Sequence, residues 1–128
     1  MTDAVEQPEA SGERVLIPFS EARQARDIEQ VTFNRRELDQ LLRLYSMMVG
    51  AGEWRDYAMD FLKDRAVFSV YRRSSEVPLY RIEKNPRLAR RQGEYAVIAA
   101  SGMILKRGAD LARVLGVFDK ALRLVHSR

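Results

Sequence analysis

The sequence predicts an α+β domain in which a helix precedes an antiparallel meander of about five strands and a second helix follows it. Three observations support this class. Apolar residues recur with helical spacing in the first half of the chain and again near the C-terminus. Between these two segments the apolar period is two, which is the period of strands. Short turn-forming segments separate the strand-like runs, and strands joined in this way pair antiparallel.

The first 30 residues are expected to be a disordered acidic arm outside the domain. They are rich in Glu, Gln, Pro, Ser and Ala and offer little to bury, which is typical of disordered segments. Val15–Phe19 is a short apolar exception that would either add an edge strand or dock on a partner. The single α+β domain is then expected over residues 31–128.

A helix is predicted from Arg35 to Val49. Asn34 can cap it, and Glu37 stands three residues later, at the spacing of a capping box. The apolar side chains of this segment recur at intervals of three and four residues, so one face is suited to burial. Gly50 and Gly52 end the helix, because glycine readily takes the left-handed conformation found at helix C-termini.

Alternating apolar and polar side chains predict three consecutive strands, at residues 57–62, 66–71 and 79–84. Lys63 and Asp64 supply the turn between the first two. The segment 54–62 is also compatible with a helix. We prefer a strand, because β-branched and aromatic residues dominate the run that adjoins it.

The second half of the chain continues the meander. Asn85-Pro86 combines a cap with a proline at the first helical position, and predicts a helical turn over residues 87–92. Two further strands are expected at residues 95–100 and 103–107, on either side of a Ser101-Gly102 turn. The final helix begins near Asp110, whose charge suits the positive end of the helix dipole.

The C-terminal helix is apolar over more of its circumference than one buried face requires. One apolar stripe is formed by Leu111, Leu115, Phe118, Leu122 and Val125. A second stripe beside it is formed by Val114, Val117, Ala121 and Leu124. A helix of this kind is covered on two sides within its own chain or shared with another subunit. We expect a homodimer through this helix, with cover by the first helix or by Val15–Phe19 as the alternative.

Composition excludes several classes of function. The chain of 128 residues is 46% hydrophobic and 31% charged, which is the profile of a globular domain. It has no cysteine, so disulfides, thiolate nucleophiles and cysteine-bound zinc are excluded, and His126 alone makes neither a triad nor a metal site. No apolar run is long enough to span a bilayer, and the first residues lack the order of a signal peptide. We expect a cytoplasmic protein that has no cofactor.

The sequence contains no nucleotide-binding or catalytic motif. Asp56, Asp60 and Asp64 share one face of a strand and would form a weak cation site, but we favour their interpretation as solvated charges or as partners of Arg55 and Arg65. We therefore predict that the protein is not an enzyme. A ligand pocket between the sheet and its helices is the least supported alternative.

Charge is distributed unequally along the chain. Residues 1–64 carry 8 basic and 13 acidic side chains, whereas residues 65–128 carry 14 and 5, so the two halves have net charges of −5 and +9. A division of this kind often accompanies a polyanionic partner. In the alternative, the basic side chains only solvate exposed strand faces and helix ends.

Arginines and tyrosines are interleaved on the predicted strands, and an open sheet face holds single-stranded nucleic acid with these two residue types. We predict a non-enzymatic binding or regulatory domain that engages an anionic partner, with nucleic acid as the first candidate. The expected contacts are Arg72, Arg73, Arg81, Lys84, Arg87, Arg90, Arg91, Lys106, Arg107, Tyr71 and Tyr80. Cross-strand pairing of the arginines with Glu76 and Glu83 is the structural alternative.

A second hypothesis is a protein–protein interaction module or assembly subunit that uses the N-terminal arm and the C-terminal helix. An arm that folds on contact can cover a large surface of its partner.

Four segments carry a resemblance to a known family: residues 52–64, 66–73, 75–84 and 103–108. They resemble a small alphaproteobacterial family known only as a domain of unknown function, and the resemblance covers roughly residues 31–118. It implies a bacterial cytoplasmic protein. It brings no activity, ligand or functional residue.

Overall fold

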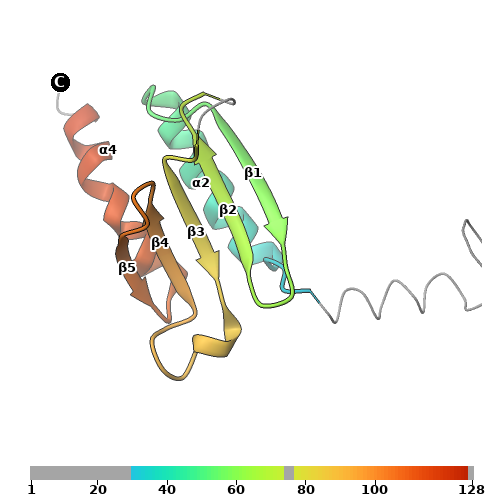
Figure 1. Cartoon of the computed structure of the whole chain (residues 1–128). Coiled ribbons are helices and arrows are strands. Elements are labelled where there is room, and N and C mark those ends of the chain that lie inside the picture. The colour runs from blue at the N-terminus through green and yellow to red at the C-terminus, as the bar shows by residue number, and fades with distance from the viewer. Residues whose placement is uncertain (1–29, 74–76, 127–128) are drawn as a thin grey trace, which may run out of the picture. The chain divides into compact units, whose positions relative to one another are not determined.

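Figure 1 shows the computed structural model of the chain, which describes residues 30–73 and 77–126. These residues belong to the unit Val31–Arg128, with the exception of Gln30. Its elements are α2 (Arg35–Gly50), β1 (Asp56–Phe61), β2 (Ala66–Tyr71), β3 (Tyr80–Lys84), the 3₁₀ turn η1 (Pro86–Leu88), β4 (Tyr95–Ala99), β5 (Ile104–Gly108), α3 (Leu111–Leu115), the 3₁₀ turn η2 (Gly116–Phe118) and α4 (Asp119–His126). The expected arm, Val15–Phe19 included, lies outside the described residues.

The five strands form one antiparallel sheet in the order β1-β2-β3-β4-β5, so each strand pairs with the next along the chain. This arrangement confirms the predicted α+β class, and β1 confirms the strand rather than the helix for the segment 54–62. The predicted strand ends differ from the observed ones by one residue at most. The pairing of β4 with β5 contains a bulge beside Val97 and Ile98.

The predicted capping box of α2 is present. Glu37 N–H donates to Asn34 Oδ1 at 2.8 Å, and Asn34 N–H donates to Glu37 Oε1 at 2.8 Å. The pair satisfies two of the backbone donors that every helix N-terminus leaves free.

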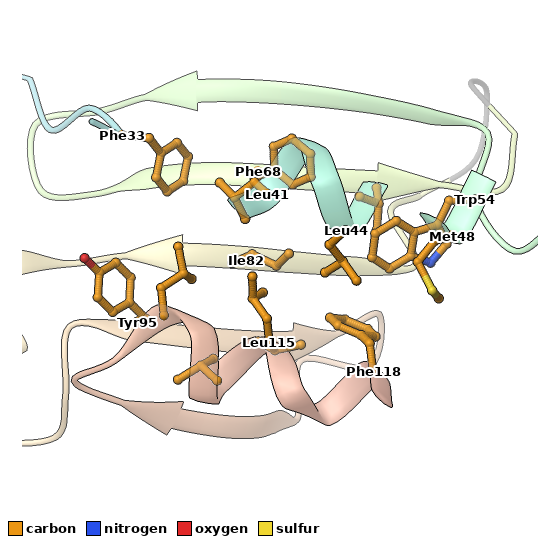
Figure 2. Close-up of a cluster of buried hydrophobic side chains, with 14 of the residues drawn as sticks. Phe33, Leu41, Leu44, Met48, Trp54, Phe68, Ile82, Tyr95, Leu115 and Phe118 are labelled. Atoms are coloured by element: carbon orange, nitrogen blue, oxygen red, sulfur yellow. The ribbon is translucent and has the colours of Figure 1, made fainter. Parts of the chain in front are cut away.

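The helices lie on one face of the sheet, and the core fills the space between them (Figures 1 and 2). The core members that the helices and strands contribute include Leu41, Leu44, Met48, Leu111, Val114, Leu115, Phe68, Val70, Ile82 and Val97. Trp54 is buried against Phe118, with ring centroids 5.1 Å apart at 90°. Each large side chain buried here stabilises the fold by about 1.5–3 kcal/mol. We call this side of the sheet the covered face.

No helix among the described residues covers the opposite side, which we call the open face. Val67, Ser69, Ala96 and Ile98 lie outside the core cluster and are nevertheless buried. The register places Arg81 of β3 between Ser69 and Ile98, and Glu83 between Val67 and Ala96. Long polar side chains therefore stand among the small and apolar residues of this face.

The sequence predicts one continuous C-terminal helix. The structure instead has α3, η2 and α4 in succession. Asp110 is the N-cap, and its side chain accepts from Ala112 N–H at 3.1 Å. Gly116 is a weak helix former, and the chain tightens to a 3₁₀ turn there.

Part of the second apolar stripe is covered within the chain. Val114 is buried in the core, and Val117 packs against it. The side chain of Leu124 lies outside the described residues. The homodimer stays a prediction.

Candidate anion-binding surface

The predicted contact residues lie at different ends and faces of the sheet. Arg72 and Arg73 follow β2, beside the end of the sheet where β3 begins. The connection between β3 and β4 lies at the opposite end, where β5 also finishes. We call this second end the basic end and define it by Arg87, Arg90, Arg91, Lys106, Arg107 and Arg113.

The connection after β3 begins with a capped turn. The Asn85 side chain accepts from Arg87 N–H at 3.2 Å, and Pro86 occupies the start of the turn. The predicted helical turn over residues 87–92 is thus the shorter η1 followed by turns, and it closes where Gly93 N–H donates to Leu88 O at 2.9 Å. Arg87, Arg90 and Arg91 are all exposed on it.

A close backbone approach holds this connection against β5. Gly93 has φ +105°, and a Cβ built on it would lie 2.6 Å from the carbonyl carbon of Gly108. Arg107 Nη1 donates to Gly93 O at 3.2 Å. The arginines of the connection and the cations of β5 are therefore brought to the same end of the sheet.

A cleft of about 400 Å³ lies where β5 passes into α3. Its lining is made by Lys106, Arg107, Gly108, Ala109, Asp110, Arg113 and Val114. Helix α3 is in contact with β5 here, because Val114 Cγ2 would be 3.4 Å from a Cβ placed on Gly108. The cleft thus combines three cationic side chains with one carboxylate.

Ion pairing neutralises little of the basic end. Arg113 Nε lies 3.9 Å from Asp110 Oδ2, and these two side chains are 86% and 61% exposed. Within residues 30–73 and 77–126, no ion pair involves Arg87, Arg90, Arg91, Lys106 or Arg107. An exposed pair of this kind contributes at most about 1 kcal/mol. The positive charge of the basic end is therefore available to an anion.

Arg81 and Tyr71 lie on the open face. Arg81 Nε is 3.4 Å from Glu83 Oε2, and the Arg81 side chain is 41% exposed. Tyr71 ends β2 opposite Asp56, away from the basic end. Both side chains are partly exposed, but they do not adjoin the cleft.

Tyr80 and Lys84 lie on the covered face with Ile82. The Tyr80 ring packs against Phe118, with centroids 5.1 Å apart. Lys84 Nζ donates to Glu37 Oε1 at 2.8 Å and to Thr32 O at 2.9 Å. These two predicted contact residues are thus engaged inside the domain.

Glu37 is the centre of this interior cluster, which also includes Tyr95. Tyr95 OH donates to Glu37 Oε2, and Lys84 forms an ion pair with the other oxygen. Burial acts to raise the pKa of the Glu37 carboxyl, but hydrogen bonds from Lys84, Tyr95 and Asn34 outweigh it, and the pKa is lowered. Burial, followed by the hydrogen bond to Glu37, raises the pKa of the Tyr95 phenol.

Arg113 is the member of the basic end that the sequence does not indicate. It lies on helix α3, whereas the other cations lie on the connection after β3 and on β5, and the packing of α3 on β5 brings it beside Lys106. One of the three aspartates at positions 56, 60 and 64 has the role that we favour for them, that of an arginine partner. Asp64 Oδ2 lies 3.8 Å from Arg65 Nη1. In the described part of the chain, no three side chains of the metal-binding types cluster.

In the part of the chain that the structure describes, side chains fill the space between the sheet and the helices, and Trp54, Phe68, Leu41 and Ile82 are almost fully buried. This packing argues against a ligand pocket in that position. None of the helices described has both the length and the apolar character needed to cross a bilayer.

Comparison with known proteins agrees with the family resemblance. Residues 31–115 match the model of a family described as a protein of unknown function, DUF2794. The chain belongs to this family. No curated protein and no solved structure matches the chain. The DUF2794 match spans every strand and α2 and ends at the last residue of α3, so it includes the whole basic end.

Proposed function

We propose that this domain is a non-enzymatic binding module for an anionic partner, and that single-stranded nucleic acid is the partner its surface suits best. The observation that carries the proposal is the gathering of six cations at the basic end, five of them without an ion pair among the described residues. Concentrated positive charge attracts phosphate groups and accelerates their encounter. The family resemblance implies that this happens in the bacterial cytoplasm.

The open face supports a nucleic-acid strand rather than a single ion. It adjoins the basic end, carries Arg81 on its central strand and has Tyr71 toward its far end. Strand β3 has five residues, so the face measures roughly 17 Å along the strands. RNA-binding sheets hold two or three stacked bases on a face of this kind. Guanidinium groups would contact phosphates, and Tyr71 would stack on a base.

The acidic side chains of the open face define a path for the strand. Asp56 and Asp60 lie on β1, at the edge of the sheet farthest from β5. Their repulsion of phosphate disfavours a path over β1. Glu83, the acidic residue of β3, pairs with Arg81 on the same strand.

The test is fluorescence anisotropy with labelled oligothymidine and with oligouridine of the same length, over a series of salt concentrations. Removal of one cation that binds a phosphate should reduce the slope of log affinity against log salt by about 0.7. The double variant Arg90→Gln/Arg91→Gln should therefore reduce the slope by about 1.4. The variant Lys120→Gln/Arg123→Gln is the control, because it removes the same charge from exposed positions on α4.

The control should keep the slope of the unmodified protein. Equal reductions in the two double variants would mean that net charge alone drives binding, and would count against the basic end. Absence of binding to both polymers at low salt would remove the proposal.

A specific observation favours a second candidate, a protein-interaction module. Met103, Ile104 and Leu105 are consecutive apolar residues at the start of edge strand β5, and they are 60%, 50% and 37% exposed. Consecutive exposed apolar residues on a sheet edge are typical of protein contacts. Affinity capture from lysate decides between the two candidates. Partners that remain bound after nuclease treatment, and that the Ile104→Lys variant does not capture, would favour the protein-interaction module.

A further inference from the structure

The cleft between β5 and α3 differs from the rest of the basic end because it is concave. Arg87, Arg90 and Arg91 stand on an exposed turn, whereas Lys106 and Arg113 line a depression of about 400 Å³. Ligand sites in proteins have volumes from about 300 to 1,000 Å³. The cleft is thus larger than one phosphate group requires and has room for part of a nucleoside.

The cations of the cleft come from both faces of β5 and from α3. Lys106 pairs in register with the core residue Val97, so it lies on the covered face, toward α3. Arg107 belongs to the open face, and its guanidinium group is fixed by the hydrogen bond to Gly93 O. Arg113 stands on α3, next to the residue that contacts Gly108. A group in the cleft would therefore meet Lys106 and Arg113, with Arg107 on the opposite face of β5.

The charge of the lining matches a phosphomonoester better than a phosphodiester. The lining carries three cations and one carboxylate, Asp110, which already accepts from Ala112 N–H. The formal net charge of the lining residues is therefore +2, to which Arg107 contributes from the open face. A phosphomonoester carries about −1.5 to −2 at neutral pH, and each linking phosphate of a nucleic acid carries about −1.

We propose that this cleft binds a phosphomonoester, the chemistry found at the phosphorylated end of a nucleic-acid strand and in a free mononucleotide. The inference deepens the proposed function. It rests on that function when the ligand is the end of a nucleic-acid strand rather than a free mononucleotide. Lys106 and Arg113 contact the phosphate, and the wall formed by Gly108 and Ala109 contacts the sugar.

The experiment compares three thymidine oligomers of equal length that carry a 5′-phosphate, a 3′-phosphate or no terminal phosphate, together with adenosine monophosphate. A phosphate at one of the two ends should tighten binding by about tenfold near pH 7.5, the expected size of a new charge-assisted contact. The gain should shrink below about pH 6, where the phosphate takes up its second proton. Adenosine monophosphate should shift the backbone amide signals of Gly108 and Ala109 in the unmodified protein.

Two variants locate the effect. Lys106→Gln/Arg113→Gln should abolish the tenfold gain, so that the phosphorylated and unphosphorylated oligomers bind with equal affinity, whereas Lys120→Gln/Arg123→Gln should retain the gain. Equal affinities for all three oligomers would overturn the phosphomonoester site and leave the proposed function standing. Amide shifts with the mononucleotide but no binding of any oligomer would support the site and overturn the proposed function. A gain that survives Lys106→Gln/Arg113→Gln would place the phosphate elsewhere and overturn the inference.

Discussion

Glu37 takes part in two structures at once. Through Oε1 it completes the capping box of α2, and through both oxygens it binds Lys84 and Tyr95 on the sheet. A buried carboxylate is costly unless charged and polar partners surround it, and here each oxygen has a partner. The cluster therefore fixes the N-terminal end of α2 to β3 and β4.

The lowered pKa of Glu37 makes the cluster sensitive to acid. Because the pKa in the folded state lies below the ordinary value of 4.5, the charged carboxylate contributes stability above that pH and loses it as the pH falls toward the folded-state pKa. We expect Glu37→Gln to lower the free energy of unfolding at pH 7 by about 1–3 kcal/mol and to flatten its decline below about pH 4.5. Urea denaturation across a pH series measures both effects.

Asp39→Asn is the matched control, since it neutralises an exposed carboxylate of the same helix. It should change the free energy of unfolding by no more than about 0.5 kcal/mol. An acid profile of Glu37→Gln that follows that of the unmodified protein would show that other groups govern the acid response.

The sequence predicts the interaction of Glu37 with Asn34 but not its interactions with Lys84 and Tyr95. Asn34 stands three positions away, so the capping box is visible as a pattern. Lys84 and Tyr95 are 47 and 58 positions away, and no periodicity relates them to Glu37. For that reason, the sequence does not distinguish Lys84 from the exposed cations of the basic half of the chain.

Among the elements, the junction of η1, β4 and β5 depends on a glycine contact. The sequence predicts a helical turn over residues 87–92, but not that the backbone of the next residue, Gly93, touches Gly108. Gly93→Ala would combine a strained φ of +105° with a Cβ only 2.6 Å from backbone atoms that cannot yield easily. We expect it to lower the free energy of unfolding by about 2 kcal/mol or more.

Gly102→Ala separates the two causes. Gly102 has φ +92°, and a Cβ placed on it would meet no atom within 4 Å. Its substitution should cost only the backbone strain, about 1 kcal/mol. An equal decrease of stability in the two variants, measured by chemical denaturation, would exclude a specific contribution of the contact with Gly108.

The elements themselves follow from periodicity, because each is specified by neighbours within a few residues. The capping box and the turn residues place α2 and the strands within one residue of their observed bounds. The division of the last helix at Gly116 is different. It accompanies the burial of Phe118 against Trp54 and Tyr80, which are distant in the sequence.

For the whole molecule, the sequence shows how much positive charge the second half carries but not where it gathers. Arg90, Lys106 and Arg113 lie on a turn, a strand and a helix, and the meander brings these three elements to one end of the sheet. Arg72 belongs to the same basic half of the sequence, but the direction of β2 places it at the opposite end of the sheet. Topology therefore decides which cations lie together.

The meander order also determines how the chain folds. Each strand pairs with its immediate successor, so sheet formation closes only short loops, and proteins dominated by local contacts fold fast. The contacts of Glu37 with Lys84 and Tyr95 span much longer separations, and we expect them to form after the rate-limiting step. Glu37→Gln should then accelerate unfolding and change the refolding rate by less than about twofold. Stopped-flow measurements over a range of urea concentrations give both rates, and a slower refolding limb with an unchanged unfolding limb would instead place the docking of α2 in the folding nucleus.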